Sequence, residues 1–599
     1  MKKFTLEDFK NLPKKTKNII YISGGALLLL ALVLIFALSF NGSGPFNQKS
    51  SLNAIKNEYK DIDTEKFIIA ENRNELPIVY VKDGELYAKS SDGSGEAVNL
   101  SGDMYKSGII DRSHNYNKLA FQSKDKKVMY FIKDFVPEKY TGSLYATTDY
   151  KTSVLVDENV VVEDEYKYLK LSDDGKTALY MKNLTIENDE VYADLYVKNI
   201  DTGESICIAQ SLYAMQTDFF LSPNGEYVAS YSEHNPEKKT GGLMITKIKE
   251  NSKALVLENI KNFRIHSLAN DGSLIYTVAE TDATGEILKH SVNVIKYEDM
   301  KIASYGKSVS PTGVYVSEKG TSKFVYIDSN VGNYSAFSVS QGKEPILISD
   351  NFLGFTNIDV ENEYYIFART NEEESNSYPV FLKTPELNEA VTLAEVKSPV
   401  DIWRSVDYKT FYYISDGTLY TREFKKGKLT DPDKIAENVD NMACAQSGNA
   451  VVFETDINEE AKTSSLKCYT KKSKKVSDII KDAKLDSYRL SADGTCVMYT
   501  TDFIEKDFTS NLNIYNIYNK GENNYALKDK VSLMPYFFDQ YQASLTESEI
   551  SVRNKFYQRA ASTVLYYKDA DVNCNASLYL FDSGKNTLID KNVITVLFE

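Results

Sequence analysis

The five cysteines have the chemistry that is easiest to recognise from spacing. None of them forms a C-x-x-C pair, and even the two closest in sequence, Cys444 and Cys468, are too far apart for a paired zinc-ligand motif. Cys207 and Cys496 stand within apparent strands, where cysteine behaves as a small buried hydrophobic residue. With Cys574 the count is odd, so we expect no dense disulfide framework, although one pair could be bridged outside the cell.

The four histidines offer no metal-binding pattern. They are His114, His234, His266 and His290, and no two of them have the H-x-x-x-H spacing of a helical zinc site. Each is expected to be a surface or strand residue rather than a ligand.

One acidic run resembles the start of a calcium-binding loop. Asp569, Asp571 and Asn573 form D-x-D-x-N, but Cys574 stands where the loop needs glycine and Leu580 where it needs glutamate. We therefore interpret the run as the polar tip of a hairpin.

Carboxylate catalysis cannot be assigned to particular residues. A glycosidase needs two opposed carboxylates, and the chain has 85 acidic residues with no pair singled out. The Asp-box turn of sialidase-like propellers ends in tryptophan, whereas the chain has one tryptophan, Trp403, and Ser172, Asp174 and Gly175 do not keep the box spacing. The sequence predicts no catalytic, cofactor-binding or metal-binding residue, and it leaves the binding residues unknown.

A repeated stretch supplies the elements that would position any site. LSDDGKTALY at Leu171 returns as LSPNGEYVAS, LANDGSLIYT, VSPTGVYVSE and LSADGTCVMY, which begin at Leu221, Leu268, Val309 and Leu490. In the second copy Ser222 opens a turn, Pro223 fixes φ, and Gly225 accepts a left-handed φ without strain. Each copy therefore predicts a hairpin turn followed by a strand.

Weaker copies of this stretch make the pattern periodic. They begin at Asn115, Val360, Val406 and Ala445, and the turns recur about every 46 residues, which is typical of propeller blades. A second hairpin falls between successive turns, as in ADLYVKNIDTGESICIA at Ala193, where Gly203 closes the turn. Two hairpins for each repeat predict an all-β fold of about eight four-stranded blades, in one large ring closed by strands from both ends or in two rings.

These motifs carry a family resemblance. The pairing of the L-S-[DP]-[DN]-G turn with the LYV-x-N-I-D-T-G hairpin is similar to the TolB-type propeller repeat, which also occurs in the propellers of dipeptidyl peptidases. The resemblance covers most of residues 78 to 599 and implies a propeller fold. A peptidase would add G-x-S-x-G and a hydrolase domain, yet the nearest strings are G-S-G at Gly42 and Gly93, and no residues for that domain follow the last hairpin. We expect no enzyme.

The N-terminal region predicts a membrane anchor. Residues 1–18 contain six lysines and two acidic residues, and Ile19–Phe40 has no charge over about 33 Å of helix. The lysines place the N-terminus in the cytoplasm and the rest of the chain outside. A cleaved signal peptide is the alternative, because Ala37 and Ser39 suit a cleavage site. Residues 41–75 form a juxtamembrane linker, and residues 76–599 form the extracytoplasmic propeller region.

Two features of the propeller region break the simple pattern. Residues 531–561 are rich in aromatic residues without a glycine turn, which predicts a helical insertion that packs across the ring or meets a partner. Tyrosine is also frequent, with 43 residues against 28 phenylalanines. Exposed tyrosines would suit a peptide or glycan surface, but tyrosine is also a strong strand former.

The sequence therefore predicts a single-pass membrane protein of the cell envelope that binds a protein, peptide or glycan partner or acts as a scaffold. The formal net charge of −15 argues against nucleic-acid binding. Partners are expected on the face that bears the longer loops at Thr185–Tyr192, Ser232–Gly242 and Asn371–Tyr378. A carboxylate-based hydrolase in the channel and a structural subunit of an envelope complex are the alternatives.

Overall fold

The computed structural model describes most of the chain after residue 75. The described residues are 76–105, 116, 119–162, 169–187, 190–213, 219–235, 240–260, 263–281, 287–306, 308–330, 333–340, 343–370, 377–398, 402–485, 487–504, 509–518, 524–527, 531–532, 556–560, 563–571, 575–582 and 584–598. The predicted anchor Ile19–Phe40 and linker 41–75 lie outside them. Within the described ranges no helix is long and apolar enough to cross a membrane.

The described elements are strands and one short 3-10 helix, η4 (Pro137–Lys139). The first strands are β1 (Ile78–Lys82), β2 (Glu85–Lys89), β3 (Val98–Asp103), β4 (Ala120–Gln122), β5 (Met129–Val136), β6 (Thr141–Thr147), β7 (Val154–Val161), β8 (Leu169–Leu171), β9 (Thr177–Glu187), β10 (Glu190–Asn199), β11 (Ser205–Tyr213), β12 (Phe220–Leu221), β13 (Tyr227–Asn235), β14 (Thr240–Lys247) and β15 (Ser252–Ile260). Next come β16 (Phe263–Leu268), β17 (Ser273–Thr281), β18 (Ile287–Lys296), β19 (Ile302–Tyr305), β20 (Val309–Val316), β21 (Phe324–Asn330), β22 (Asn333–Val339), β23 (Ile346–Ser349), β24 (Phe352–Asp359), β25 (Tyr364–Arg369), β26 (Tyr378–Lys383), β27 (Val391–Val396), β28 (Ile402–Arg404), β29 (Thr410–Ser415) and β30 (Thr418–Lys425). The last are β31 (Lys428–Leu429), β32 (Asp433–Ala436), β33 (Met442–Cys444), β34 (Ala450–Asn458), β35 (Thr463–Thr470), β36 (Lys475–Lys484), β37 (Arg489–Leu490), β38 (Cys496–Ile504), β39 (Thr509–Asn516), β40 (Tyr525–Ala526), β41 (Val531–Ser532), β42 (Phe556–Ala560), β43 (Thr563–Lys568), β44 (Ala576–Asp582) and β45 (Lys585–Leu597).

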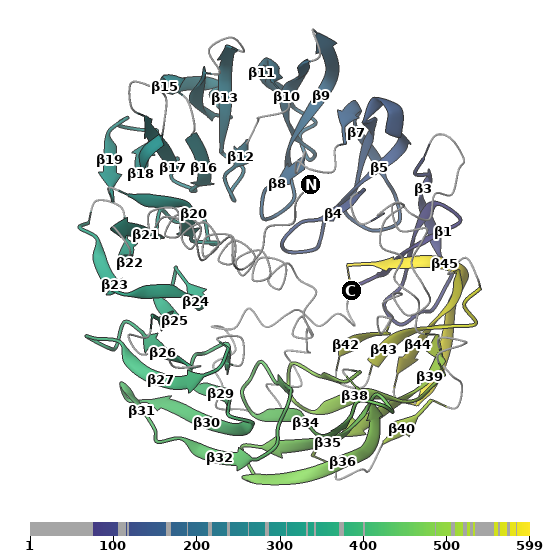
Figure 1. Ribbon diagram of the computed structural model, residues 1–599. Coiled ribbons are helices and arrows are strands. Elements are labelled where there is room, and N and C mark those ends of the chain that lie inside the picture. Colours follow the sequence, from purple (N-terminus) through teal and green to yellow (C-terminus); the bar gives the residue numbers. More distant parts are fainter. Residues whose placement is uncertain are drawn as a thin grey trace, which may run out of the picture.

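These strands form antiparallel meanders with an inner first strand and an outer fourth strand (Figure 1). In two of them the fourth position is shared by two short strands, β31 with β32 and β40 with β41. Meander 1 consists of the end of β45 with β1 to β3; meanders 2 to 7 take β4–β7, β8–β11, β12–β15, β16–β19, β20–β23 and β24–β27; meanders 8 to 11 take β28–β32, β33–β36, β37–β41 and β42–β45. The described strands thus give eleven meander units, nine of four strands and two of five, whereas about eight four-stranded blades are expected from the sequence.

Consecutive meanders pack face to face through apolar side chains. In one cluster Ile366 of meander 7 lies with Phe411 of meander 8, and in another Val452 of meander 9 lies with Val497 of meander 10. Second strands are buried on both sides, as the pattern of β29 shows, whereas third strands such as β35 alternate between buried and half-buried residues. This radial stacking of small twisted sheets is the architecture of a β-propeller.

Strands from both ends of the described region close the circuit. β45 pairs with β44 through its first half and with β1 through its second half, with Val79 opposite Leu597 and Lys82 opposite Val593. Figure 1 shows β45 beside β1, where the two ends of the colour scale meet. The predicted closure by strands from both ends is therefore confirmed.

The repeated turn is built around a serine hydroxyl. Ser172 Oγ donates to Asp174 Oδ1 (2.7 Å) and accepts the N–H of Thr177 (3.0 Å), while the N–H of Gly175 donates to the Ser172 carbonyl (2.8 Å). Gly175 has φ +70°, and a Cβ there would lie 2.6 Å from Ser123 Cβ of the preceding meander. Glycine is thus required both by the left-handed φ and by the contact between meanders. The same serine bonds occur at Ser123, Ser222, Ser405 and Ser491.

The turns of meanders 2 to 6 join into a closed cycle. Asp173 connects its neighbours on both sides, because its carbonyl accepts the N–H of Asp125 (3.4 Å) and its N–H donates to Pro223 (2.7 Å). Asn270 Oδ1 accepts the N–H of Asn224, and the N–H of Asn270 donates to the Gly320 carbonyl. Lys124 Nζ donates to the Glu318 carbonyl (2.9 Å), which closes the cycle between meanders 6 and 2. The sequence leaves open whether the meanders form one ring or two. In the structure each described meander packs against the next, and β45 joins the last meander to the first. The cycle of turns connects five meanders of this series.

Two predicted turns are wrong in position. Gly313 of the VSPTG copy lies inside β20, where a register shift between Val309 and Val314 takes up the extra residues, and the turn of that meander ends at Gly320 (φ +69°). The copy at Asn115 contains β4, the first strand of its meander rather than the second, and the turn of that meander falls at residues 123–128, where Lys126 takes the left-handed φ (59°). The other named turns lie where the sequence places them.

The helical insertion expected at residues 531–561 is not a helix at its described ends. Val531–Ser532 is β41 and Phe556–Ala560 is β42, while residues 533–555 lie outside the described ranges. Tyr557 of β42 packs edge-on against Tyr567 of β43. The aromatic residue here therefore belongs to a strand that contacts the core and not to a helix. The tyrosine excess has the same cause, since Tyr130, Tyr180 and Tyr412 are among the largest fully buried side chains.

Two matching clamps join neighbouring meanders. Asp157 of β7 accepts bonds from Tyr180 Oη (2.7 Å) and Lys182 Nζ (2.5 Å) of β9. Asp590 of β45 accepts the equivalent bonds from Tyr80 Oη (2.7 Å) and Lys82 Nζ (2.9 Å) of β1. They occur in the two sheets that each contain two meanders. Burial raises the pKa of both carboxyls, but the lysine and tyrosine partners outweigh it and hold each pKa below the ordinary value of an aspartate.

We expect the clamps to make stability depend on pH. Because the pKa of Asp157 and of Asp590 is lower in the folded protein, their contribution is complete at neutral pH and is lost as pH falls through the folded values. Asp157→Asn and Asp590→Asn should each lower the free energy of unfolding by about 1–3 kcal/mol at pH 7. Urea denaturation midpoints at pH 7 and pH 3 should show this difference shrinking in acid.

An exposed pair provides the control. Asp201 binds Lys176 with both side chains about half exposed, so Asp201→Asn should leave the urea midpoint unchanged at either pH. A deficit for Asp590→Asn that stays constant between pH 7 and pH 3 would contradict the assigned role of its charge.

Candidate binding surface

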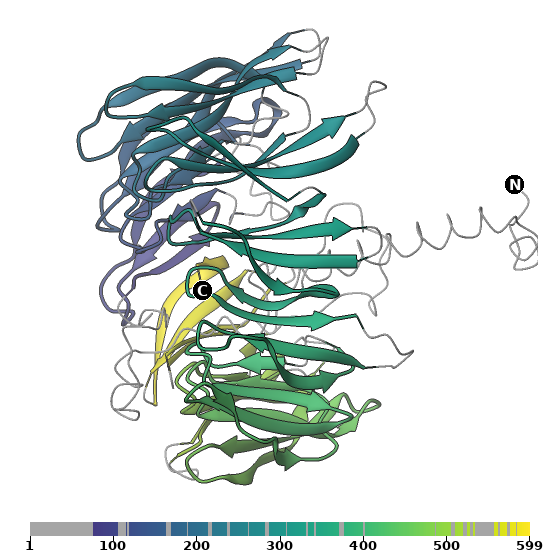
Figure 2. The same ribbon diagram turned by 90° about the vertical axis from the view of Figure 1, so that its left-hand side faces the viewer.

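The meander order gives the ring two different faces. Figure 2 shows the strands running across the thickness of the ring, so that their connections lie at two opposite faces. Connections from first to second and from third to fourth strands lie on one face, here called the turn face, and connections from second to third strands lie on the other, here called the hairpin face. Because β1 is a second strand and Val79 pairs with Leu597, the chain enters at Ile78 on the turn face.

The three loops expected to meet a partner lie together on the hairpin face. Thr185–Tyr192, Ser232–Gly242 and Asn371–Tyr378 each connect a second strand to a third strand, although their tips at 188–189, 236–239 and 371–376 lie outside the described residues. Among described residues of this face, Asp416 and Glu459 are exposed. The structure therefore places the loops on one face without describing a site there.

A cluster of lysines occupies the turn face at meanders 8 and 9. It comes from the first turn of meander 8, which contains Lys409, and from the third-to-fourth connections of both meanders. Its members, here called the lysine surface, are Lys409, Lys425, Lys426, Lys428, Lys471, Lys472, Lys474 and Lys475. Lys471 is half-buried and the other seven are exposed. Tight turns put these side chains at the surface, as the left-handed φ of Lys426 (50°) and Lys474 (53°) shows.

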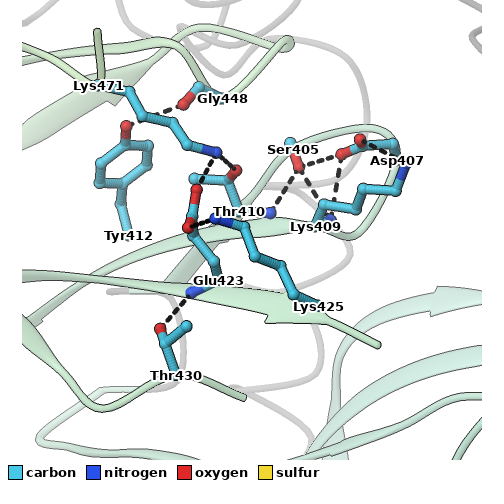
Figure 3. A network of polar contacts seen from close by, with 10 residues as sticks. All are labelled: Ser405, Asp407, Lys409, Thr410, Tyr412, Glu423, Lys425, Thr430, Gly448 and Lys471. Carbon is cyan, nitrogen blue, oxygen red and sulfur yellow. Dashed lines mark hydrogen bonds and ion pairs between the residues drawn. The ribbon is translucent and has the colours of Figure 1, made fainter. Parts of the chain in front are cut away.

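Figure 3 shows how a single glutamate joins the two meanders. The carboxylate of Glu423 contacts the ammonium groups of both Lys425 and Lys471. Lys471 Nζ also donates to Thr410 Oγ1 (2.9 Å) in the neighbouring meander. Burial raises the pKa of Glu423, but the two lysines outweigh it and lower the pKa, so the carboxylate is charged at neutral pH. The turns of meanders 8 and 9 are thereby held side by side.

The backbone beneath this surface is fixed by the serine turn. Ser405 Oγ donates to Asp407 Oδ1 (2.5 Å) and accepts the N–H of Thr410 (2.9 Å), as Figure 3 shows. Tyr412 Oη donates to the Gly448 carbonyl (2.9 Å) in the next meander. The lysines therefore project from a rigid base.

Five lysines of the surface have no acidic partner among the described residues. Asp407 lies 3.7 Å from Lys409, and Glu423 takes Lys425 and Lys471. Within the part of the chain that the structure describes, the other five make no ion pair: Lys426, Lys428, Lys472, Lys474 and Lys475. This is a concentration of uncompensated positive charge on a chain whose formal net charge is −15.

The sequence contained a signal for this surface that its interpretation missed. Lys425-Lys426-Gly427-Lys428 and Lys471-Lys472-Ser473-Lys474-Lys475 start about one repeat of 46 residues apart. Runs at the same position of adjacent repeats must be neighbours in a propeller. The net charge of the whole chain is negative, so it gives no indication of this local positive surface.

The residues examined for metal chemistry are dispersed. Cys444, Cys468 and Cys496 are buried, Cys207 is half-buried, and Cys574 lies outside the described residues. His266 Nε2 contacts Thr277 Oγ1 (3.1 Å), and burial lowers its pKa to about 4. Across the described ranges no three histidine, cysteine or acidic residues converge on a possible metal position.

The acidic run at Asp569 has the hairpin role expected for it. Asp571 Oδ1 accepts the N–H of Asn575 (2.9 Å) and Oδ2 accepts its side-chain amide (3.1 Å), so the run caps the connection between β43 and β44. Asn573 lies outside the described residues. Burial raises the pKa of Asp493, but partners lower the pKa of Asp157, Glu361 and Asp590, so the described carboxylates give no converging group with raised pKa values.

The radial meanders and their face-to-face cores define an all-β protein of the propeller class. No family model matches the chain, and no curated protein matches it. Among solved structures it is similar to a eukaryotic initiation factor (11% identity, 81% of this chain and 98% of that chain, TM-score 0.36). It is also similar to dipeptidyl peptidase 4 of Porphyromonas gingivalis (11% identity, 65% of each chain, TM-score 0.31) and to the β-propeller domain of the Trilobed protease from Pyrococcus furiosus (15% identity, 53% of this chain and 97% of that chain, TM-score 0.27). Similarities this weak carry no functional assignment.

Proposed function

We propose that the protein is a binding or scaffold module of the TolB-like propeller type, held at the cell envelope by Ile19–Phe40, with its ring outside the cytoplasm. The observation that carries the binding role is the lysine surface, because five unpaired lysines on two adjoining rigid turns are poorly explained by stability alone. The lysines repel one another, so a partner that neutralises them gains free energy.

The position of the chain entry supports the same arrangement. Ile78 starts β1 on the turn face, so the predicted linker 41–75 joins the ring on the face that carries the lysine surface. At up to about 3.5 Å for each residue the linker could reach over 100 Å, which leaves room for a partner between ring and bilayer.

Membrane fractionation of the full-length protein tests the anchor. We expect the protein to stay with the membrane after an alkaline wash, and external protease on intact cells to degrade the ring. Leu29→Arg with Leu32→Arg should move the protein to the soluble fraction, because each charge in the span is costly. Wild-type protein that is soluble, or a ring protected from external protease, would refute the proposal.

Site-directed cross-linking tests the binding face. A photo-reactive residue at Lys472 on the turn face should form a reproducible adduct in native membranes, whereas one at Lys139 on the hairpin face should not. Adducts at residue 139 alone would move the binding role to the opposite face.

A further inference from the structure

We infer that the lysine surface binds a linear polyanion whose charges are phosphate or phosphodiester groups. This inference rests on the proposed binding role and names the chemistry of the partner. The lysines lie on two neighbouring turns that Glu423 and Lys471 hold together. A chain of repeated negative groups can contact both turns at once.

The residue types favour dense charge over a shaped anion. Arginine would grip one phosphate through its planar fork, whereas lysine is a compact point charge with no preferred bidentate geometry. The two lysine runs contain no arginine. The nearby Arg422 is occupied, since its guanidinium donates to the carbonyls of Thr430 (2.7 Å), Thr392 (3.0 Å) and Leu393 (2.8 Å).

The surroundings argue against a nucleic acid and against a lipid bilayer. Single-stranded nucleic acids are held by aromatic stacking as well as by charge, and residues 425–428 and 471–475 contain no aromatic residue. A flat anionic bilayer would also meet the exposed Asp431, Asp433 and Asp478 that flank the lysines. A strip of positive charge bordered by acids suits a line of phosphates better than a plane of them.

The test uses full-length protein in zwitterionic-lipid nanodiscs with long-chain inorganic polyphosphate as the probe. The variant Lys428→Glu/Lys472→Glu/Lys475→Glu changes both turns and avoids the left-handed positions of Lys426 and Lys474. We expect its affinity to fall by about tenfold or more, and the slope of log affinity against log salt to decrease by about 2. Orthophosphate should compete poorly.

A matched variant carries the same change in charge elsewhere. Lys139→Glu/Lys249→Glu/Lys591→Glu replaces three exposed lysines of other meanders and should keep affinity within about twofold of wild type. Both variants should show wild-type thermal melting, which separates loss of binding from loss of fold.

Four results would overturn the inference. These are equal losses in the two variants, equal competition by orthophosphate, tighter binding through the same lysines to single-stranded DNA, or tighter binding to vesicles rich in phosphatidylglycerol. If polyphosphate fails to bind while the adduct at residue 472 still forms, the binding module stands and its ligand is not a phosphate polymer. If the fractionation shows no membrane anchor, the same titration is made with the full-length protein free in solution, so failure of the anchor and failure of polyphosphate binding are separate results.

Discussion

A chain that ends after Asn592 is expected to lose about 5–8 kcal/mol of stability in the meander that contains β1. The cut removes Val593, Val596 and Leu597, which are 0%, 5% and 1% exposed, and burying each such side chain contributes about 1.5–3 kcal/mol. It also removes the strand that pairs with β1. Because long repeat arrays unfold in several steps, the quantity to measure is the first urea transition, with limited proteolysis of β1 to β3.

A full-length variant separates chain length from packing. Val593→Asp with Leu597→Asp should shift the first transition in the same direction, whereas Lys591→Ala, at an exposed position, should leave it unchanged. If the shortened chain kept the wild-type midpoint and resisted protease at β1, the closure by β45 would contribute nothing to stability.

The second large effect is expected at the turn glycines. Gly175→Val should destabilise by about 3–5 kcal/mol, because it combines a left-handed φ with a Cβ that would lie 2.6 Å from Ser123 Cβ and 2.8 Å from Val128 Cβ. Gly225→Val should behave similarly, since its Cβ would meet Thr177 Oγ1 at 2.8 Å. Chemical denaturation of the purified variants measures both.

Gly203→Val isolates the backbone contribution. Gly203 has φ +71° but nothing within 4 Å of an added Cβ, so only about 1–2 kcal/mol should be lost. If Gly175→Val cost no more than Gly203→Val, the close contact between meanders would not matter to stability.

The turns were largely predictable because serine and glycine carry them, but the number of units was not. Three meanders place a residue other than glycine at the left-handed position: Lys126 (φ 59°), Glu363 (φ 59°) and Tyr408 (φ 55°). Backbone hydrogen bonds of the turn hold Lys126 and Tyr408 in the left-handed conformation. The turn therefore forms without the glycine by which it is recognised in the sequence. These weaker copies were still counted, and the nine copies of the turn belong to meanders 2 to 10. The units that the sequence missed are meanders 1 and 11, which share β45 and contain no copy of the turn.

Long-range partners were also hidden from the sequence. Asp157 with Lys182 and Asp590 with Lys82 make the same clamp, and both acids begin a D-x-N stretch while both lysines end a Y-x-K stretch. Neither short pattern alone predicts the contact, because each consists of residues that are common in strands. The lysine surface was missed for a similar reason, since its two runs become one feature only when adjacent repeats are placed side by side.

The pairing of β1 with β45 also means that β1 is synthesised long before the strand with which it pairs. Tyr80 and its partner Asp590 are separated by 510 positions, so at about 5–20 residues per second the first strand waits about 25–100 s for its neighbour. During that interval the apolar edge at Ile78 to Val81 is open to pairing with another nascent chain. The yield of correctly folded protein should therefore depend on how fast translation proceeds and on whether a chaperone shields that edge.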